Sequence, residues 1–192
     1  KVGFDKQLTP DLRVRLTGSA FSQAQATSQT LYSGDRAGSR YYSVMETNTD
    51  EKAAFTSGAV NPGFNSIHAY VVNPFIKFRG LEIFGNIETS NGRARNEGTT
   101  RTFKQNVGEV TYRFLDDALY LSTRYNKVTG RLANYTTDIE MDRTQFGGGW
   151  YINPMILLKG EWVNQNYDGF LATDVRNGGK FKGFVMEAAL AF

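Results

Sequence analysis

Alternation of apolar and polar residues with a period of two is the feature of this chain that most restricts its fold. Such a period places apolar side chains on one face of a β-strand and polar side chains on the other. It recurs in nine segments, which predicts an all-β, antiparallel, up-and-down chain. The predicted strands are Val2–Gln7, Asp11–Phe21, Ile67–Phe78, Leu81–Thr89, Phe103–Phe114, Leu119–Val128, Arg143–Ile152, Ile156–Asn166 and Lys180–Phe192.

The connections between these segments alternate between short and long. The short ones are "LTPD", "FRG", "LDDA" and "NPM"; the long, polar ones are Ser22–Asn65, Ser90–Thr102, Thr129–Asp142 and Tyr167–Gly179. Because consecutive antiparallel strands reverse direction, all short turns then lie at one end of the sheet. This asymmetry is typical of outer-membrane β-barrels, which have short periplasmic turns and longer extracellular loops.

Aromatic residues stand at the ends of the apolar faces of many predicted strands. They lie beside the short turns (Phe78, Phe114, Trp150, Phe192) and nearer the long loops (Tyr125, Phe146, Trp162, Tyr167). Two such belts of aromatic residues, one at each end of the strands, favour a transmembrane barrel. Strands of about ten residues, which span roughly 25 Å when tilted, favour it as well. A soluble barrel that binds an apolar ligand inside has the same alternation and remains an alternative.

Composition argues against several other classes. The net charge is only +3, without a basic block, so we expect no nucleic-acid partner. No cysteine is present for disulfides or thiolate metal sites, and His68 is the only histidine. No nucleophile elbow, phosphate loop or HExxH motif occurs. We therefore predict neither catalysis nor a metal or cofactor.

In a membrane barrel, the alternate strand positions that carry polar side chains face the lumen. We predict a nearly balanced lining that consists of Arg13, Arg15, Glu82, Glu88, Glu109, Arg113, Arg124, Arg143, Lys159, Glu161 and Glu187. Glu109 and Arg124 are expected to pair across neighbouring strands. Two interpretations stay open: the charges only hydrate the wall, or they sort small polar solutes and ions.

The connection from residue 22 to residue 65 has 44 residues, and connections this long without secondary structure are usually functional or disordered. If it folds inward, it narrows the pore and Arg36, Arg40, Tyr41 and Tyr42 are candidate constriction residues. If it folds outward, it forms a lid or a contact for another protein.

The last ten residues, "GFVMEAALAF", place Phe184, Met186, Ala188, Leu190 and Phe192 on one parity. This ending resembles the C-terminal assembly signal of Gram-negative outer-membrane β-barrels. The resemblance implies location in the bacterial outer membrane, contact with its lipid, and recognition by the barrel-assembly machinery.

Two further stretches, "NPFIKFRGLEIFGNIE" and "GGGWYINPMILLKGEWVNQNYDGF", resemble hairpins of the phosphate-selective porin type. That resemblance implies a sixteen-stranded barrel and a homo-trimer. Single-chain bacterial barrels have even strand numbers, so nine strands predict that residues 1–192 are the C-terminal portion of a larger barrel. If Val2–Gln7 is not a strand, an eight-stranded barrel results.

The leading functional prediction is a porin-like channel for passive diffusion of small hydrophilic solutes or ions. The alternative is a non-conducting barrel that serves as a structural subunit of a larger envelope complex.

Overall fold

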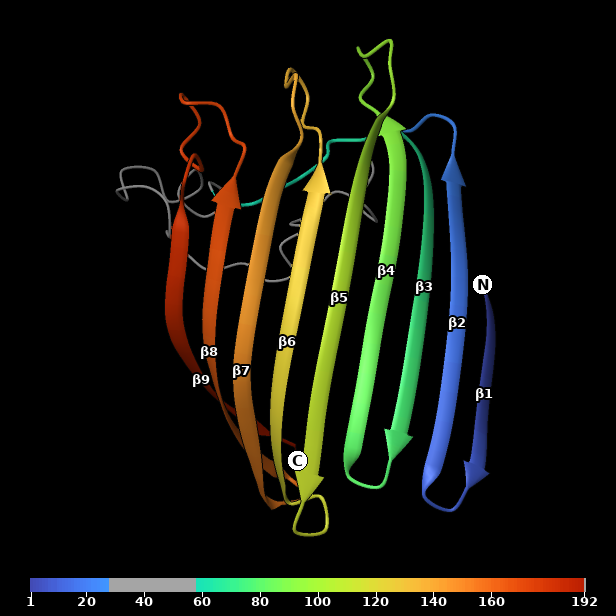
Figure 1. Cartoon of the computed structure of the whole chain (residues 1–192), viewed down its shortest axis with the longest axis vertical. Helices are drawn as coiled ribbons and strands as arrows, with labels where there is room; N and C mark the ends of the chain where they lie inside the picture. The colour runs from blue at the N-terminus through green and yellow to red at the C-terminus, as the bar shows by residue number, and fades with distance from the viewer. Residues whose placement is uncertain (28–57, 192) are drawn as a thin grey trace.

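The chain forms one antiparallel sheet of nine strands in sequential order (Figure 1). The computed structural model describes residues 1–27 and 58–191. The strands are β1 (Val2–Thr9), β2 (Leu12–Gln23), β3 (Ser66–Phe78), β4 (Leu81–Arg93), β5 (Arg101–Phe114), β6 (Leu119–Gly130), β7 (Ile139–Asn153), β8 (Ile156–Asp168) and β9 (Lys180–Leu190). The prediction of an all-β, up-and-down fold with nine strands is therefore confirmed, and the described residues contain no helix.

Short and long connections lie at opposite ends of the sheet, as predicted (Figure 1). At the short-turn end, Ala118 N–H donates to Leu115 C=O at 3.0 Å, which closes the turn between β5 and β6. At the loop end, several strands run further than the alternation predicted. β5 begins at Arg101 and β7 at Ile139, because side chains on both strands are buried there and the backbone ladder continues.

The sheet is curved and has two free edges. Among the described residues, β1 pairs with β2 alone and β9 with β8 alone. Both edge strands run toward the short-turn end, because the strands between them alternate in direction (Figure 1). The β1 strand begins about halfway up the sheet, so it covers only the short-turn half of β2.

Register defines two faces. One continuous row of paired residues runs from Arg13 through Glu82, Thr111 and Ser122 to Glu161. We call the face that carries this row the inner face and the opposite one the outer face. Every predicted lining residue lies on the inner face by register.

Candidate functional site

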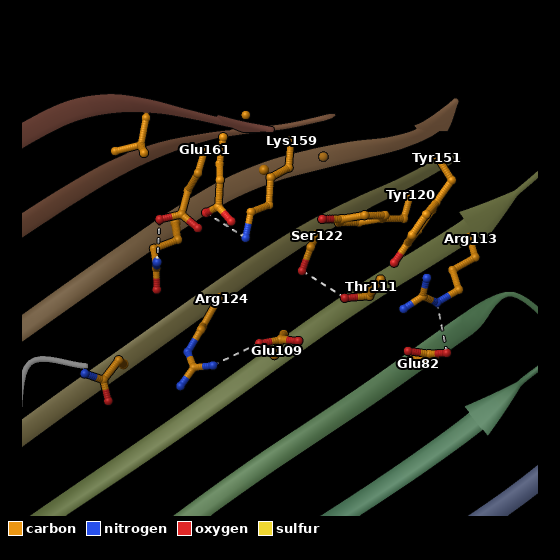
Figure 2. Close-up of a pocket in the computed structure, with 17 residues that line it drawn as sticks. Glu82, Glu109, Thr111, Arg113, Tyr120, Ser122, Arg124, Tyr151, Lys159 and Glu161 are labelled. Carbon is orange, nitrogen blue, oxygen red and sulfur yellow. Dashed lines mark hydrogen bonds and ion pairs between the residues drawn. The ribbon is translucent and has the colours of Figure 1, made fainter. Parts of the chain in front are cut away.

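A polar pocket of about 490 Å³ occupies the short-turn half of the inner face. Strands β4 to β9 contribute its walls (Figure 2). Seven predicted lining residues border it: Glu82, Glu109, Arg113, Arg124, Lys159, Glu161 and Glu187. The alternation in the sequence thus identified charged groups that share one hollow, although it did not show which of the predicted lining residues would border it.

Opposite charges neutralise one another across neighbouring strands of the pocket. Arg124 Nη1 lies 3.1 Å from Glu109 Oε2, which confirms the predicted pair. Glu82 accepts from Arg113 at 3.1 Å (Figure 2). It also accepts from Lys77 at 3.1 Å, and Lys159 Nζ lies 3.0 Å from Glu187. All these side chains are partly exposed, so each pair contributes at most about 1 kcal/mol. The alternation of signs leaves a polar wall without a block of one charge.

Glycines in β7 make room for an aromatic ring beside the charges. The Tyr120 ring lies against Gly149, where a Cβ atom would overlap the ring. The Arg113 guanidinium lies 5.5 Å from the centre of the same ring, within the range of a cation–π interaction. Tyr120 is therefore held between the backbone of β7 and a charged side chain.

The loop half of the inner face is mainly apolar, although polar side chains such as Arg143 and Gln165 are also buried there. A buried cluster fills it: Val60, Phe64, Ile67, Ala69, Phe103, Val128, Leu132, Ile139, Met141, Tyr167 and Phe170. In the same region the outer face carries Lys104, Lys127 and Glu140. From the short-turn end to the loop end, the inner face therefore changes from polar to mainly apolar, and the outer face changes from apolar to polar. The signal was in the sequence, since Phe103, Val128 and Met141 share parity with the polar inner residues.

Two predicted positions differ because of this exchange. Arg143 lies on the inner face but is only 2% exposed, and its Nε donates to Gln165 Oε1 at 2.6 Å. Tyr167, which we predicted to belong to the belt of aromatic residues nearer the long loops, is instead buried in the inner cluster. Tyr167 is two residues from Gln165 on β8 and therefore points to the same inner face, whereas Trp162 points to the outer face.

A short segment, residues 58–65, covers this apolar cluster; we call it the strap. It crosses the loop end of the sheet from the side of β8 to the start of β3 (Figure 1). Val60 and Phe64 point from the strap into the cluster. Tyr167 Oη donates to Gly58 C=O at 2.8 Å. Gly63 has a φ of 66°, which lets the chain turn there at little cost.

The strap is the described end of the predicted connection, and this end folds inward. At its other end, Ser22 and Gln23 belong to β2. The candidate constriction residues Arg36, Arg40, Tyr41 and Tyr42 lie outside the described residues.

Two loop carboxylates beside the strap are held in the ionised form. The guanidinium of Arg176 holds the pKa of Asp174 well below its usual value of 3.8, and the Tyr135 hydroxyl also donates to it, at 2.7 Å. Burial alone would raise the pKa of Glu97. Hydrogen bonds from Arg101 and from Ala94 N–H outweigh burial, so the pKa of Glu97 is lowered.

The outer face exposes a band of apolar side chains over the short-turn half of the sheet. Leu121 is 63% exposed and Leu190 66%. The band also includes Leu16, Ile76, Phe78, Ile83, Ile87, Tyr112, Tyr125, Phe146, Trp150, Leu158 and Trp162. On β6 it runs from Leu119 to Tyr125, or about 20 Å along the strand.

The predicted assembly signal lies partly within the described structure. Phe184, Met186, Ala188 and Leu190 all lie exposed on the outer face of β9. Phe192 falls outside the described residues.

Other candidate chemistry is sparse in this part of the chain. His68 is exposed on the outer face, and its Nδ1 lies 2.9 Å from Ser22 Oγ. No group of three or more His, Cys, Asp or Glu side chains among the described residues is arranged to hold a metal ion. Nor does any helix within residues 1–27 and 58–191 have the length and apolarity needed to cross a membrane.

Comparison with known proteins adds no relative to this description. No protein-family model and no curated protein matches the chain.

Proposed function

We propose that the nine strands form part of the wall of a β-barrel in the bacterial outer membrane, and that the barrel is a channel for passive diffusion of small hydrophilic solutes and ions. The observation that carries this proposal is the sidedness of the short-turn half. There the outer face is an exposed apolar band and the inner face a pocket of paired charges. Contiguous exposed apolar surface on this scale is typical of membrane contact or of an interface.

The free edges favour a larger barrel. In lipid, each unpaired backbone group of β1 or β9 would cost several kcal/mol, so further strands must pair with both edges. Because β1 and β9 run in the same direction, antiparallel closure requires an odd number of added strands. The expected sixteen-stranded barrel meets this condition, since sixteen minus nine is seven.

The proposed ion selectivity follows from the paired charges of the pocket. Cations and anions alternate around the pocket, so ions of either sign meet a nearby partner. Rings of a single charge would favour one sign strongly. We therefore propose weak ion preference and no marked phosphate selectivity.

Conductance of the full-length protein in planar bilayers tests the proposal. We expect stable, stepwise increases in current at low voltage, and none from the same preparation after heat denaturation. Silence from folded, inserted protein would contradict the channel.

The second candidate is a non-conducting barrel that serves as a subunit of an envelope complex. The strap and its buried cluster favour it, because they fill the loop half of the inner face. This candidate predicts insertion into membranes without conductance. A soluble barrel, in contrast, predicts a monodisperse protein without detergent and leaves the outer band unexplained.

A further inference from the structure

Two arginines from different elements, β5 and the loop after β8, hold the strap in the same way. Arg101, at the start of β5, donates to both carboxylate oxygens of Glu97 at 2.8 Å and to Pro62 C=O at 2.9 Å. Arg176, in the loop between β8 and β9, donates to both oxygens of Asp174 at 2.7 to 2.8 Å and to Ala59 C=O at 2.7 Å. Each guanidinium therefore joins a carboxylate that is close to it in sequence to a carbonyl of the strap.

Each guanidinium also lies over an aromatic ring of the buried cluster. Arg101 lies 5.0 Å from the centre of the Phe64 ring, and Arg176 lies 4.8 Å from that of Phe170. The Arg101 side chain is only 6% exposed. A planar guanidinium suits this combination, because its donors form a rigid fork and its face stacks on a ring. A lysine ammonium cannot meet both requirements.

The strap has two separate contact points with arginine side chains. Ala59 is held by Arg176 from the loop after β8, near one edge of the sheet, and Pro62 is held by Arg101 from β5, the central strand. Val60 lies between these two points and is fully buried. Release of one arginine would leave the strap attached at the other, so we expect the two contacts to reinforce each other.

We infer that Arg101 and Arg176 are positioning residues that fix the strap as a permanent constriction at the loop end of the channel. The constriction role rests on the proposed channel function, whereas the positioning of the strap does not. The strap is then a static part of the pore wall, and the open channel carries a steady current without long closures.

A single introduced cysteine reports on the strap, because the natural chain has none. Val60→Cys in the full-length protein places a thiol at a fully buried site. We expect slow reaction with a water-soluble maleimide. In the background of Arg101→Gln together with Arg176→Gln, we expect the labelling rate to rise at least tenfold, with a smaller rise for each single change.

A matched control comes from the same loop as Glu97. Arg95 is exposed, and its backbone N–H, not its side chain, donates to Asn65 Oδ1. Arg95→Gln removes the same charge and should leave the labelling rate unchanged. Single-channel recordings of the double variant should show larger or noisier conductance steps than those of the parent protein.

The outcomes separate the two claims. Labelling of the double variant at the parental rate overturns the inference. Faster labelling with a parent protein that never conducts supports the positioning role and overturns the channel. If the double variant does not fold, Arg101→Lys with Arg176→Lys replaces it, and an unchanged labelling rate there also overturns the inference.

Discussion

Arg124 and Val128 lie on the same face of β6, four residues apart, yet Arg124 lines a polar pocket while Val128 is fully buried beneath the strap. One strand therefore presents a polar and an apolar environment on a single face. The boundary coincides with the end of the apolar band on the opposite face, near Tyr125. Together these relationships divide the sheet into a half with an apolar outer face and a polar inner face, and a half that folds around its own core.

Reversing the charge of Arg124 tests whether the pocket carries ions. Arg124→Glu removes the partner of Glu109 and places two carboxylates side by side, so we expect a shift of ion preference toward cations. The reversal potential under a tenfold salt gradient measures it, with about 59 mV as the limit for perfect selectivity. Lys104→Glu makes the same charge change on the outer face of β5 and should have little effect. An unchanged potential for Arg124→Glu would remove the pocket from the ion path.

Leu121→Arg tests the sidedness of the sheet. Leu121 is highly exposed on the outer face, so a soluble protein should tolerate the change with little loss of stability. In a bilayer, an arginine at that depth should destabilise the barrel by about 2–4 kcal/mol. Chemical unfolding from lipid vesicles gives this free energy. Thr129→Arg, higher on the same face of β6, serves as the control and should cost much less; equal effects would argue against a membrane band.

Gly149→Val tests the contact beneath Tyr120. The new side chain would occupy the position of the tyrosine ring and push it toward the pocket. We expect destabilisation by about 1–3 kcal/mol, as for other overpacked sites, and a lower conductance. Urea unfolding followed by tryptophan fluorescence measures the first effect. Gly98→Ala is the control, since nothing lies near that position; equal stability of the two variants would contradict the packing that we describe.

The attachment of the strap should depend on pH only under acidic conditions. The pKa values of Asp174 and Glu97 lie below their usual 3.8 and 4.5. Lowered pKa values in the folded state mean that the stabilisation is complete above the usual values and is lost as the pH falls further. A spin label on Asn61→Cys, an exposed strap position, should show constant mobility from pH 8 to about pH 5, and higher mobility only as the pH falls well below the usual pKa values of the two carboxylates.

Asp174→Asn provides the comparison for that titration. It removes one carboxylate and weakens the hold of Arg176 on the strap. We expect a more mobile spin label already at neutral pH. A parent protein whose label loosens between pH 8 and pH 6 would point to a different titrating group.

The local alternation of residues was sufficient to predict much of this molecule. It identified nine strands, the two kinds of connection, the shared face of the charged residues and the pairing of Glu109 with Arg124. These features depend only on neighbours along one strand or across one hairpin. A period of two determines which side a residue takes, and a tight turn determines the register of its hairpin.

What covers a face depends on segments far apart in the chain, and only the tertiary structure decided it. Parity placed Arg143 with Arg124, but the strap and cluster at the loop end leave the first buried and the second in contact with the pocket. The strap is contacted by Arg101, Tyr167 and Arg176, which lie far from it in sequence. No local pattern encodes such contacts, because burial is set by whatever segment comes to lie above a side chain.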